Sequence, residues 1–478
     1  MDIAEKVSRI NKDPSIYGTF AEIGAGQEVA HAFFKGGKAS STIAKTMSAY
    51  DMKFSDAIYG EDEYYVSRKR LIRMLNKEID LLQNRLQDRR VTSKFFVFAN
   101  TVATGSQRRQ VGGHGWLGVA FQHHPMAEIS QAVVHIRFLP RLFLQQHRAV
   151  GLIGVNLLYA CYFHLSHQGE FISSLKDELD LDVLEVDGVD FSGVAFKHVD
   201  NRSVVLDLVK RGLSGAVLFD QQGQPKPPSV HLHKKHLVAT RGSFRPLTLG
   251  KWAIMRAGWH KHISMHGLNE DEILHVAGIS LADVHLSGAL DVDDFLARVD
   301  LLASMGICVL ISEYLTDFSF VECLNKYTSL SKALVVGTHS LTKVLDETRY
   351  LHLKGGLLEA LGIMVSHNAT LYLYPIKLPR REVLASDCVF LSQNKRLLLN
   401  YMQSTGLCTE LTPLETSKES SDDDKRDENI EEKDTTEYIS AENVRILIEN
   451  NEPWECYVPT KVVDFIKKHR LYGYKKDV

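Results

Sequence analysis

The chain has 478 residues, of which 44% are hydrophobic and 24% charged, the composition of an ordinary globular protein with two or three domains. Its formal net charge of −3 gives no electrostatic reason to expect nucleic-acid binding. The opening segment MDIAEKVSRINKD is charged throughout, and no run of about 20 apolar residues exists, so we expect neither a signal peptide nor a membrane partner. The six cysteines form no CxxC pair, which favours reduced thiols and a cytoplasmic location.

A glycine turn in the segment AEIGAGQEVA is the first candidate site. The pattern predicts a short strand, a turn at Gly24 and Gly26, and a helix that starts near Glu28. Such a turn lets the backbone approach a ligand, and the free N–H groups of the helix start point towards it. The third glycine of a dinucleotide fingerprint is missing, whereas Glu22 before the glycines resembles the first motif of S-adenosylmethionine-dependent methyltransferases. We predict Glu22, Gly24, Gly26 and Glu28 as cofactor-binding residues, with a purely structural turn as the alternative.

A long helix and three strands are predicted next. Leucine and isoleucine repeat at helical spacing between Glu63 and Arg89, as a stripe that packs in a core or against a partner. Apolar runs at 94–102, 115–122 and 129–139 are typical of strands and are separated by glycine or proline turns. We therefore expect the first lobe, residues 1–230, to contain a mixed sheet covered by helices.

Carboxylates follow in the predicted strand LEVDGVDFSG, at residues 184–193. We expect Glu185, Asp187 and Asp190 to lie on one face of this strand. Carboxylates at a strand end hold Mg²⁺ or act as acid and base, so we predict Asp187 and Asp190 as catalytic residues. A solvated strand face is the alternative.

A second candidate site is the segment RGSFRPLT, at residues 241–248, which combines arginines and hydroxyl side chains in a proline-containing loop. Arginine binds phosphate and carboxylate groups through paired hydrogen bonds, so we predict Ser243 and Arg245 as part of an anion clamp. His262 and His266 have the spacing of zinc ligands on a helix. No third ligand or neighbouring catalytic glutamate accompanies them, so we predict no metal site.

The last third alternates apolar strand-like runs, at 307–312, 333–337 and 369–374, with helical stretches. This rhythm predicts a parallel, Rossmann-like sheet in a second lobe over residues 240–400. The segment 415–437 has eleven acidic and four basic residues and no aromatic one, which predicts a disordered acidic linker. We expect residues 438–478 to dock back onto the protein.

Several segments resemble an uncharacterised family of bacterial proteins. They are YGTFAEIGAGQEVA (17–30), TIAKTMSAYDM (42–52), VDFSG (189–193), VDNRS (199–203), RGSFRP (241–246) and KGGLLEALG (354–362). Members of that family carry the names nicotinate- or nicotinamide-nucleotide adenylyltransferase, or TonB-dependent receptor. The adenylyltransferase name implies ATP and a mononucleotide as ligands and nucleotidyl transfer as the reaction.

Taken together, these patterns predict an α/β protein of two packed lobes, one with a mixed sheet and one with a parallel Rossmann-like sheet. The leading hypothesis is a cytoplasmic enzyme of transferase type that binds a nucleotide or another phosphate ligand, with Mg²⁺ left open as a cofactor. One alternative is an S-adenosylmethionine-dependent methyltransferase. The other is a non-catalytic interaction or assembly protein, which the leucine stripe and the acidic segment favour. A homo-oligomer is compatible with either kind of function.

Overall fold

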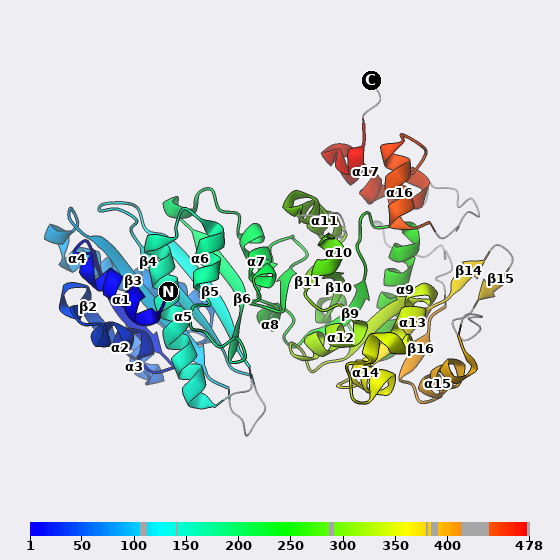
Figure 1. The fold of residues 1–478 in the computed structure, drawn as a ribbon, viewed down its shortest axis with the longest axis horizontal. Helices are drawn as coiled ribbons and strands as arrows, with labels where there is room; N and C mark the ends of the chain where they lie inside the picture. Colours follow the sequence, from blue (N-terminus) through cyan, green and yellow to red (C-terminus); the bar gives the residue numbers. More distant parts are fainter. Residues whose placement is uncertain are drawn as a thin grey trace. The chain divides into compact units, whose positions relative to one another are not determined.

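The computed structural model describes residues 1–105, 112–139, 142–285, 291–378, 381–383, 391–412 and 439–475. Their contacts divide the chain into two compact units, Met1–Val217 (unit 1) and Leu218–Val478 (unit 2) (Figure 1). The division falls inside the strand β7, Ala216–Phe219. The acidic segment that we predict to be a disordered linker lies outside the described residues.

Unit 1 is built on a mixed sheet of six strands in the order β2-β1-β3-β4-β5-β6. In this sheet β1 pairs in parallel with β2 and β3, whereas the pairs from β3 to β6 are antiparallel. The strands are β1 (Ile16–Ile23), β2 (Ile43–Met47), β3 (Lys94–Ala103), β4 (His114–Phe121), β5 (Ser130–Phe138) and β6 (Leu184–Ser192).

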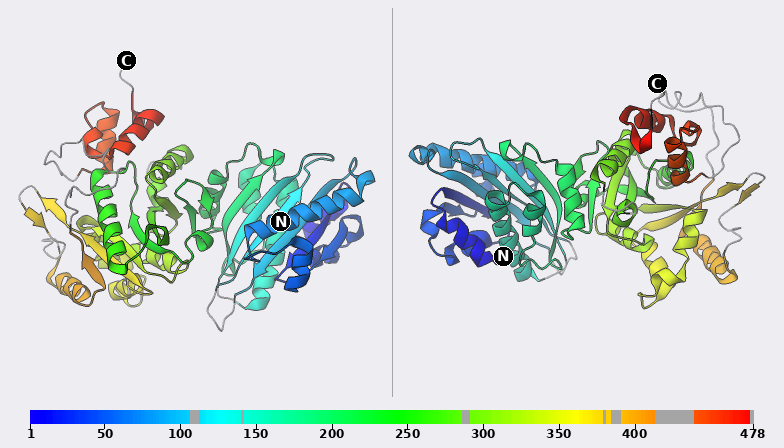
Figure 2. Two further views of the ribbon diagram at one scale, coloured as in Figure 1. Left: turned by 180° about the vertical axis from the view of Figure 1, so that it is seen from behind. Right: turned by 45° about the horizontal axis from the view of Figure 1, so that its top comes forward.

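Helices cover both faces of this sheet. The long helix α4 packs on one face of the sheet, against β1, β3 and β4 (Figure 2). Its stripe Leu71, Leu75 and Ile79 is buried there among the apolar side chains of these strands. The leucine stripe is therefore part of the core of unit 1. On the other face α5 packs against α1 and α2. The helices are α1 (Ile3–Lys12), α2 (Glu28–Lys35), α3 (Met52–Tyr59), α4 (Arg68–Arg85), α5 (Phe143–Phe163), α6 (Gln168–Ser174) and α7 (Asn201–Lys210).

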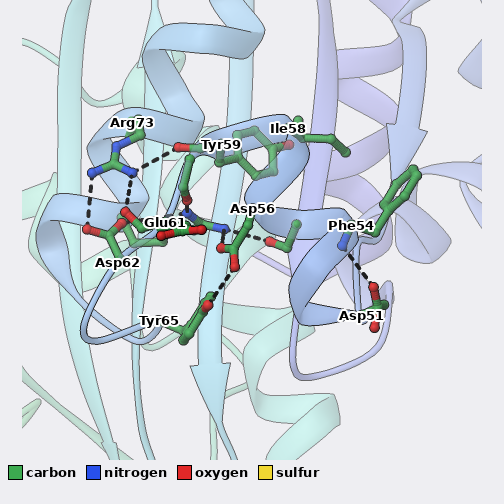
Figure 3. A network of polar contacts seen from close by, with 12 residues as sticks. Asp51, Phe54, Asp56, Ile58, Tyr59, Glu61, Asp62, Tyr65 and Arg73 are labelled. Atoms are coloured by element: carbon green, nitrogen blue, oxygen red, sulfur yellow. Dashed lines mark hydrogen bonds and ion pairs between the residues drawn. The ribbon is translucent and has the colours of Figure 1, made fainter.

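The helix α4 begins later than the sequence predicts because polar contacts hold the residues before it in a loop. The Ser67 hydroxyl caps the helix by accepting the backbone N–H three residues further on, at 3.1 Å. Before this cap, Arg73 donates to the Asp62 carboxylate at 3.0 Å, and the Tyr65 hydroxyl donates to Asp56 at 2.8 Å (Figure 3). These contacts compete with the helical conformation.

Unit 2 is built on eight strands in the order β16-β13-β12-β9-β10-β11-β7-β8. The five pairs from β16 to β11 are all parallel, and β7 pairs with β8 in an antiparallel hairpin. The parallel sheet that the sequence predicts is confirmed, although the sequence patterns missed its central strands β9 and β10. The strands are β7 (Ala216–Phe219), β8 (Pro225–Lys226), β9 (His236–Arg241), β10 (Ile273–Ser280), β11 (Cys308–Ser312), β12 (Lys332–Gly337), β13 (Ala369–Tyr374) and β16 (Cys408–Glu410).

Helices lie on both faces of this second sheet too. On one face, α9 buries Ile254 and Ala257 against Val238 and Val335. On the other face, the Phe320 ring of α12 fills the space above Gly278. None of the helices in the described part of the chain has the length and apolarity of a membrane-spanning helix. The main helices are α9 (Leu249–His266), α11 (Val292–Ser304), α12 (Asp317–Asn325), α13 (Thr338–Val344), α14 (Gly356–Met364), α15 (Gln393–Ser404), α16 (Ala441–Glu449) and α17 (Thr460–His469).

Candidate functional site

The glycine turn joins β1 to α2, where the sequence predicts it. Gly24 and Gly26 both have positive φ angles, of 102° and 73°. A Cβ atom added to Gly24 would lie 1.8 Å from the carbonyl oxygen of Val102 on β3, whereas the nearest atom to a Cβ on Gly26 would be Nδ1 of His147, at 3.4 Å. A glycine is therefore needed at Gly24 because the backbone passes close to β3. At Gly26 it is needed mainly because the backbone has a positive φ angle.

The buried carboxylate of Glu22 binds the backbone N–H groups at the start of α2. It accepts hydrogen bonds from the backbone N–H groups of Val29, at 3.2 Å, and Ala30, at 2.9 Å. Burial raises the pKa of Glu22 to about 7. Glu22 thus takes two of the donors that the helix start would offer to a phosphate. Glu28 begins α2 and packs against Gly151 of α5, and the ligand roles of these residues stay predictions.

Three neighbouring strands of unit 1 carry a chain of hydrogen-bonded side chains on the α4 face of the sheet. Nδ1 of His135 on β5 lies 2.5 Å from Oδ1 of Asp187 on β6. On the other side, Nε2 of His135 lies 3.2 Å from Nδ1 of His114, the first residue of β4. His135 and Asp187 are buried, and His114 is partly exposed. We call these three residues the His–His–Asp relay.

Two further contacts frame the relay. The Trp116 ring lies against His135, with 4.6 Å between the ring centroids. In the next row of the sheet, the Arg137 guanidinium donates to the Glu185 carboxylate at 2.6 Å. The sequence patterns did not single out His135. The signal was present in β5, because histidine and arginine alternate with apolar residues in the segment VVHIRF.

Asp187 and Asp190, the two predicted catalytic residues, share the α4 face for a reason that the sequence does not show. Residues three apart face opposite sides of a regular strand. An irregularity in the pairing of β5 with β6, between His135 and Ile136, shifts the register and brings both carboxylates to one face. Asp190 forms an ion pair with Arg68 at the start of α4. No three His, Cys, Asp or Glu side chains in the described ranges are grouped as metal ligands.

In unit 2, the predicted anion clamp follows β9. Arg245 donates through Nε to the Asp294 carboxylate at 2.8 Å, and Arg298 donates to the backbone carbonyl of Ser243 at 3.3 Å. Arg241, the last residue of β9, donates to Asp317 at 3.0 Å. Each loop arginine is therefore already paired with a carboxylate. The anion-binding role of Ser243 and Arg245 stays a prediction.

Lys251, which the sequence analysis did not single out, lies in the first turn of α9. Its Nζ donates to the backbone carbonyl of Arg241 at 2.6 Å. Within the described residues, no carboxylate forms an ion pair with it. Burial lowers the pKa of Lys251 to about 8, so the amine is still mostly protonated at pH 7. A cation without a bonded carboxylate thus lies beside the carboxyl end of β9.

The carboxyl ends of β9 and β12 form a topological switch point. β9 lies next to both β10 and β12, and the chain continues from β10 to β11 on one side and from β12 to β13 on the other. Ligands of doubly wound sheets bind outside the carboxyl ends of the strands at such a point. Lys251 and the loop 242–248 are located there, and we call this position the switch-point site.

The sequence matches no protein-family model and no curated protein. Among solved structures, part of the chain is similar to the competence/damage inducible protein CihA from Agrobacterium tumefaciens, with 20% identity over 28% of this chain and 79% of that one and a TM-score of 0.20. A competence or damage-inducible protein from Enterobacter asburiae is 14% identical over 33% of this chain and 94% of that one, with a TM-score of 0.24. A competence-damaged protein (CinA) superfamily protein from Enterobacter cloacae is 13% identical over 34% of this chain and 92% of that one, with a TM-score of 0.25. The α/β class of this chain rests on its own strand pairing.

Proposed function

We propose that the chain is an enzyme of transferase type that binds a nucleotide, or another ligand with a phosphate group, at the switch-point site. The observation that carries this proposal is the strand order of unit 2, which runs β11-β10-β9-β12-β13-β16 with all pairs parallel. This is the order 3-2-1-4-5-6 of doubly wound nucleotide-binding folds. The ligand would lie outside the carboxyl ends of β9 and β12.

The charge at this position supports a phosphate. The Lys251 amine has a carbonyl oxygen as its bonded partner, so an anion that approaches it would form a new ion pair without breaking an existing one. By contrast, Arg241 and Arg245 would each have to leave a carboxylate before binding phosphate. We therefore assign the main phosphate contact to Lys251.

The resemblance of segment 241–246 to a family with an adenylyltransferase name agrees with this location, because that segment is the loop that follows β9. We accordingly propose ATP or a nicotinate mononucleotide as the ligand and nucleotidyl transfer as the reaction, with S-adenosylmethionine as the competing ligand. No disulfide joins cysteines in the described ranges, where Cys161, Cys308 and Cys408 are buried, which supports a cytoplasmic location.

Ligand binding by paired lysine variants tests the proposal. Isothermal titration calorimetry and thermal unfolding would be carried out on the full chain with NAD, ATP, nicotinate mononucleotide and S-adenosylmethionine. We expect one of them to bind and to raise the melting temperature, because a ligand that binds only the folded state stabilises it. Lys251→Met should weaken its binding by roughly tenfold to a hundredfold, the effect of losing one charged hydrogen bond.

Lys261→Met is the matched control. Lys261 is an exposed lysine on the same helix, ten residues further along, and its substitution should leave the affinity unchanged. Equal affinities of both variants would place the ligand elsewhere. A panel in which nothing binds would reject the nucleotide proposal and favour the non-catalytic alternative.

A further inference from the structure

We propose that unit 1 binds a small amphipathic carboxylate, an anion with an apolar body, in a cavity beside the helix α4. The cavity has a volume of about 330 Å³ and lies between the second half of α4 and the strands β1 and β2. It is independent of the switch-point site, because all of its lining residues belong to unit 1.

Much of the cavity wall is apolar. Leu81 and Leu82 of α4, Leu86 directly after this helix and the Tyr17 ring of β1 all line it. Leu82 and Tyr17 also pack in the core of unit 1, whereas Leu81 is exposed. Small-molecule sites are typically concave and apolar, with volumes of about 300–1,000 Å³ and a few polar groups that orient the ligand. The wall therefore suits the apolar body of a small ligand.

The buried carboxylate in the wall does not make the cavity anionic. Glu78 of α4 forms an ion pair with Lys45 of β2 and accepts a hydrogen bond from the Tyr59 hydroxyl at 2.9 Å. Its side chain is 2% exposed. The charges of Glu78 and Lys45 thus cancel, and the carboxylate already has two donors.

Two arginines give this region a positive charge. Arg85, the last residue of α4, lines the cavity, and no carboxylate of the described residues pairs with it. The guanidinium of Arg89 lies over the Tyr17 ring, 4.3 Å from the ring centroid, and within the same described ranges it too has no carboxylate partner. Cations at the end of a helix also interact favourably with its dipole, but that interaction requires no cavity beside them.

The guanidinium of Arg85 would hold the anionic group of the ligand. Arginine binds a carboxylate through two parallel hydrogen bonds, and an approaching anion would not have to displace another carboxylate from Arg85. The remaining polar groups are already bonded, since the Thr19 hydroxyl donates to the Lys45 carbonyl at 2.7 Å. A ligand that is polar throughout, such as a sugar phosphate, would lose water against the leucines without gaining new partners.

Isothermal titration calorimetry on the full chain tests the ligand class. The probes are octanoate and 2-naphthoate, which separate an alkyl body from an aryl body, and each is compared with the alcohol of the same carbon skeleton. We expect at least one acid to bind about tenfold or more tightly than its alcohol, the effect of one charged hydrogen bond. Equal affinities of acid and alcohol, or no binding of either acid, would overturn the proposal.

Arg85→Met places the anionic group. The variant keeps an unbranched side chain but loses the charge, so the acid that binds should bind about tenfold to a hundredfold more weakly. Arg148→Met is the matched control, because Arg148 is an exposed arginine of α5, on the other face of the sheet. Equal affinities of the two variants would show that the acid responds to net charge alone or binds elsewhere.

A pair of substitutions at Leu81 tests the site while Arg85 is kept. Leu81 is exposed and lies four residues before Arg85, so a glutamate at this position would pair with the guanidinium and compete with the ligand. A glutamine has nearly the same shape without the charge. We expect Leu81→Glu to weaken binding of the acid about tenfold more than Leu81→Gln does. Equal losses in these two variants would refute the assignment to Arg85, even if Arg85→Met does not fold.

Discussion

At the scale of single residues, Gly24 and Gly26 occupy one turn but need glycine for different reasons. Both have a positive φ, which costs an alanine about 1 kcal/mol or more. Only Gly24 also passes so close to Val102 that a Cβ would overlap the carbonyl oxygen. The two substitutions therefore separate backbone conformation from close packing.

We predict that Gly26→Ala lowers the free energy of unfolding by about 1 kcal/mol, whereas Gly24→Ala lowers it by about 3 kcal/mol or more, because the backbone of β1 or β3 must move. Urea unfolding of both variants measures the difference. Equal losses would mean that the β1–β3 contact relaxes freely. If Gly26→Ala abolished ligand binding at an unchanged melting temperature, the turn would be a binding site after all.

At the scale of elements, the attachment of α2 depends on one buried carboxylate. Burial raises the pKa of Glu22 from 4.5 to about 7 in the folded protein. Between these values the folded protein keeps a proton that the unfolded chain releases, so stability falls as the pH rises. The contribution of Glu22 to stability is complete below about pH 4.5 and is lost as the pH rises through about 7.

Glu22→Gln tests this dependence, because glutamine stays neutral at every pH. We predict that the stability of the wild-type protein relative to the variant falls by about 2–3 kcal/mol between pH 4.5 and pH 7. Glutamine has one carbonyl oxygen for the N–H groups of Val29 and Ala30, so the variant also loses a constant amount of stability. Chemical unfolding at a series of pH values separates the two effects. A difference that does not change with pH would show that Glu22 titrates normally.

At the scale of the whole molecule, the two units have separate sheets and separate cores. We predict that residues 1–214 fold alone, because this fragment keeps all six strands of the first sheet and the bond between Val186 N–H and the Leu213 carbonyl. Circular dichroism should show cooperative thermal unfolding. A fragment of residues 1–183 is the control, since it lacks β6 and should not fold. Loss of cooperativity in the longer fragment would mean that unit 1 requires unit 2.

The sequence by itself determined the features that depend on neighbouring residues. Apolar runs identified β11, β12 and β13, because strands of a parallel sheet are buried on both faces. Helical spacing identified the stripe of α4, and glycine identified the turn after β1. These signals are local, since they arise from the period of one strand or helix or from the φ angle of one residue.

Only the tertiary structure decided which residues lie together. His114, His135 and Asp187 come from three strands and are 21 and 52 residues apart along the chain, so their hydrogen bonds depend on strand order and register. The shared face of Asp187 and Asp190 depends on an irregularity in that register, which no periodicity encodes. Lys251 becomes a candidate ligand-binding residue only through its position beside the topological switch point between β9 and β12. The composition of the candidate sites is therefore set by the pairing of distant strands, because side chains that are far apart in sequence become neighbours only when the sheet forms.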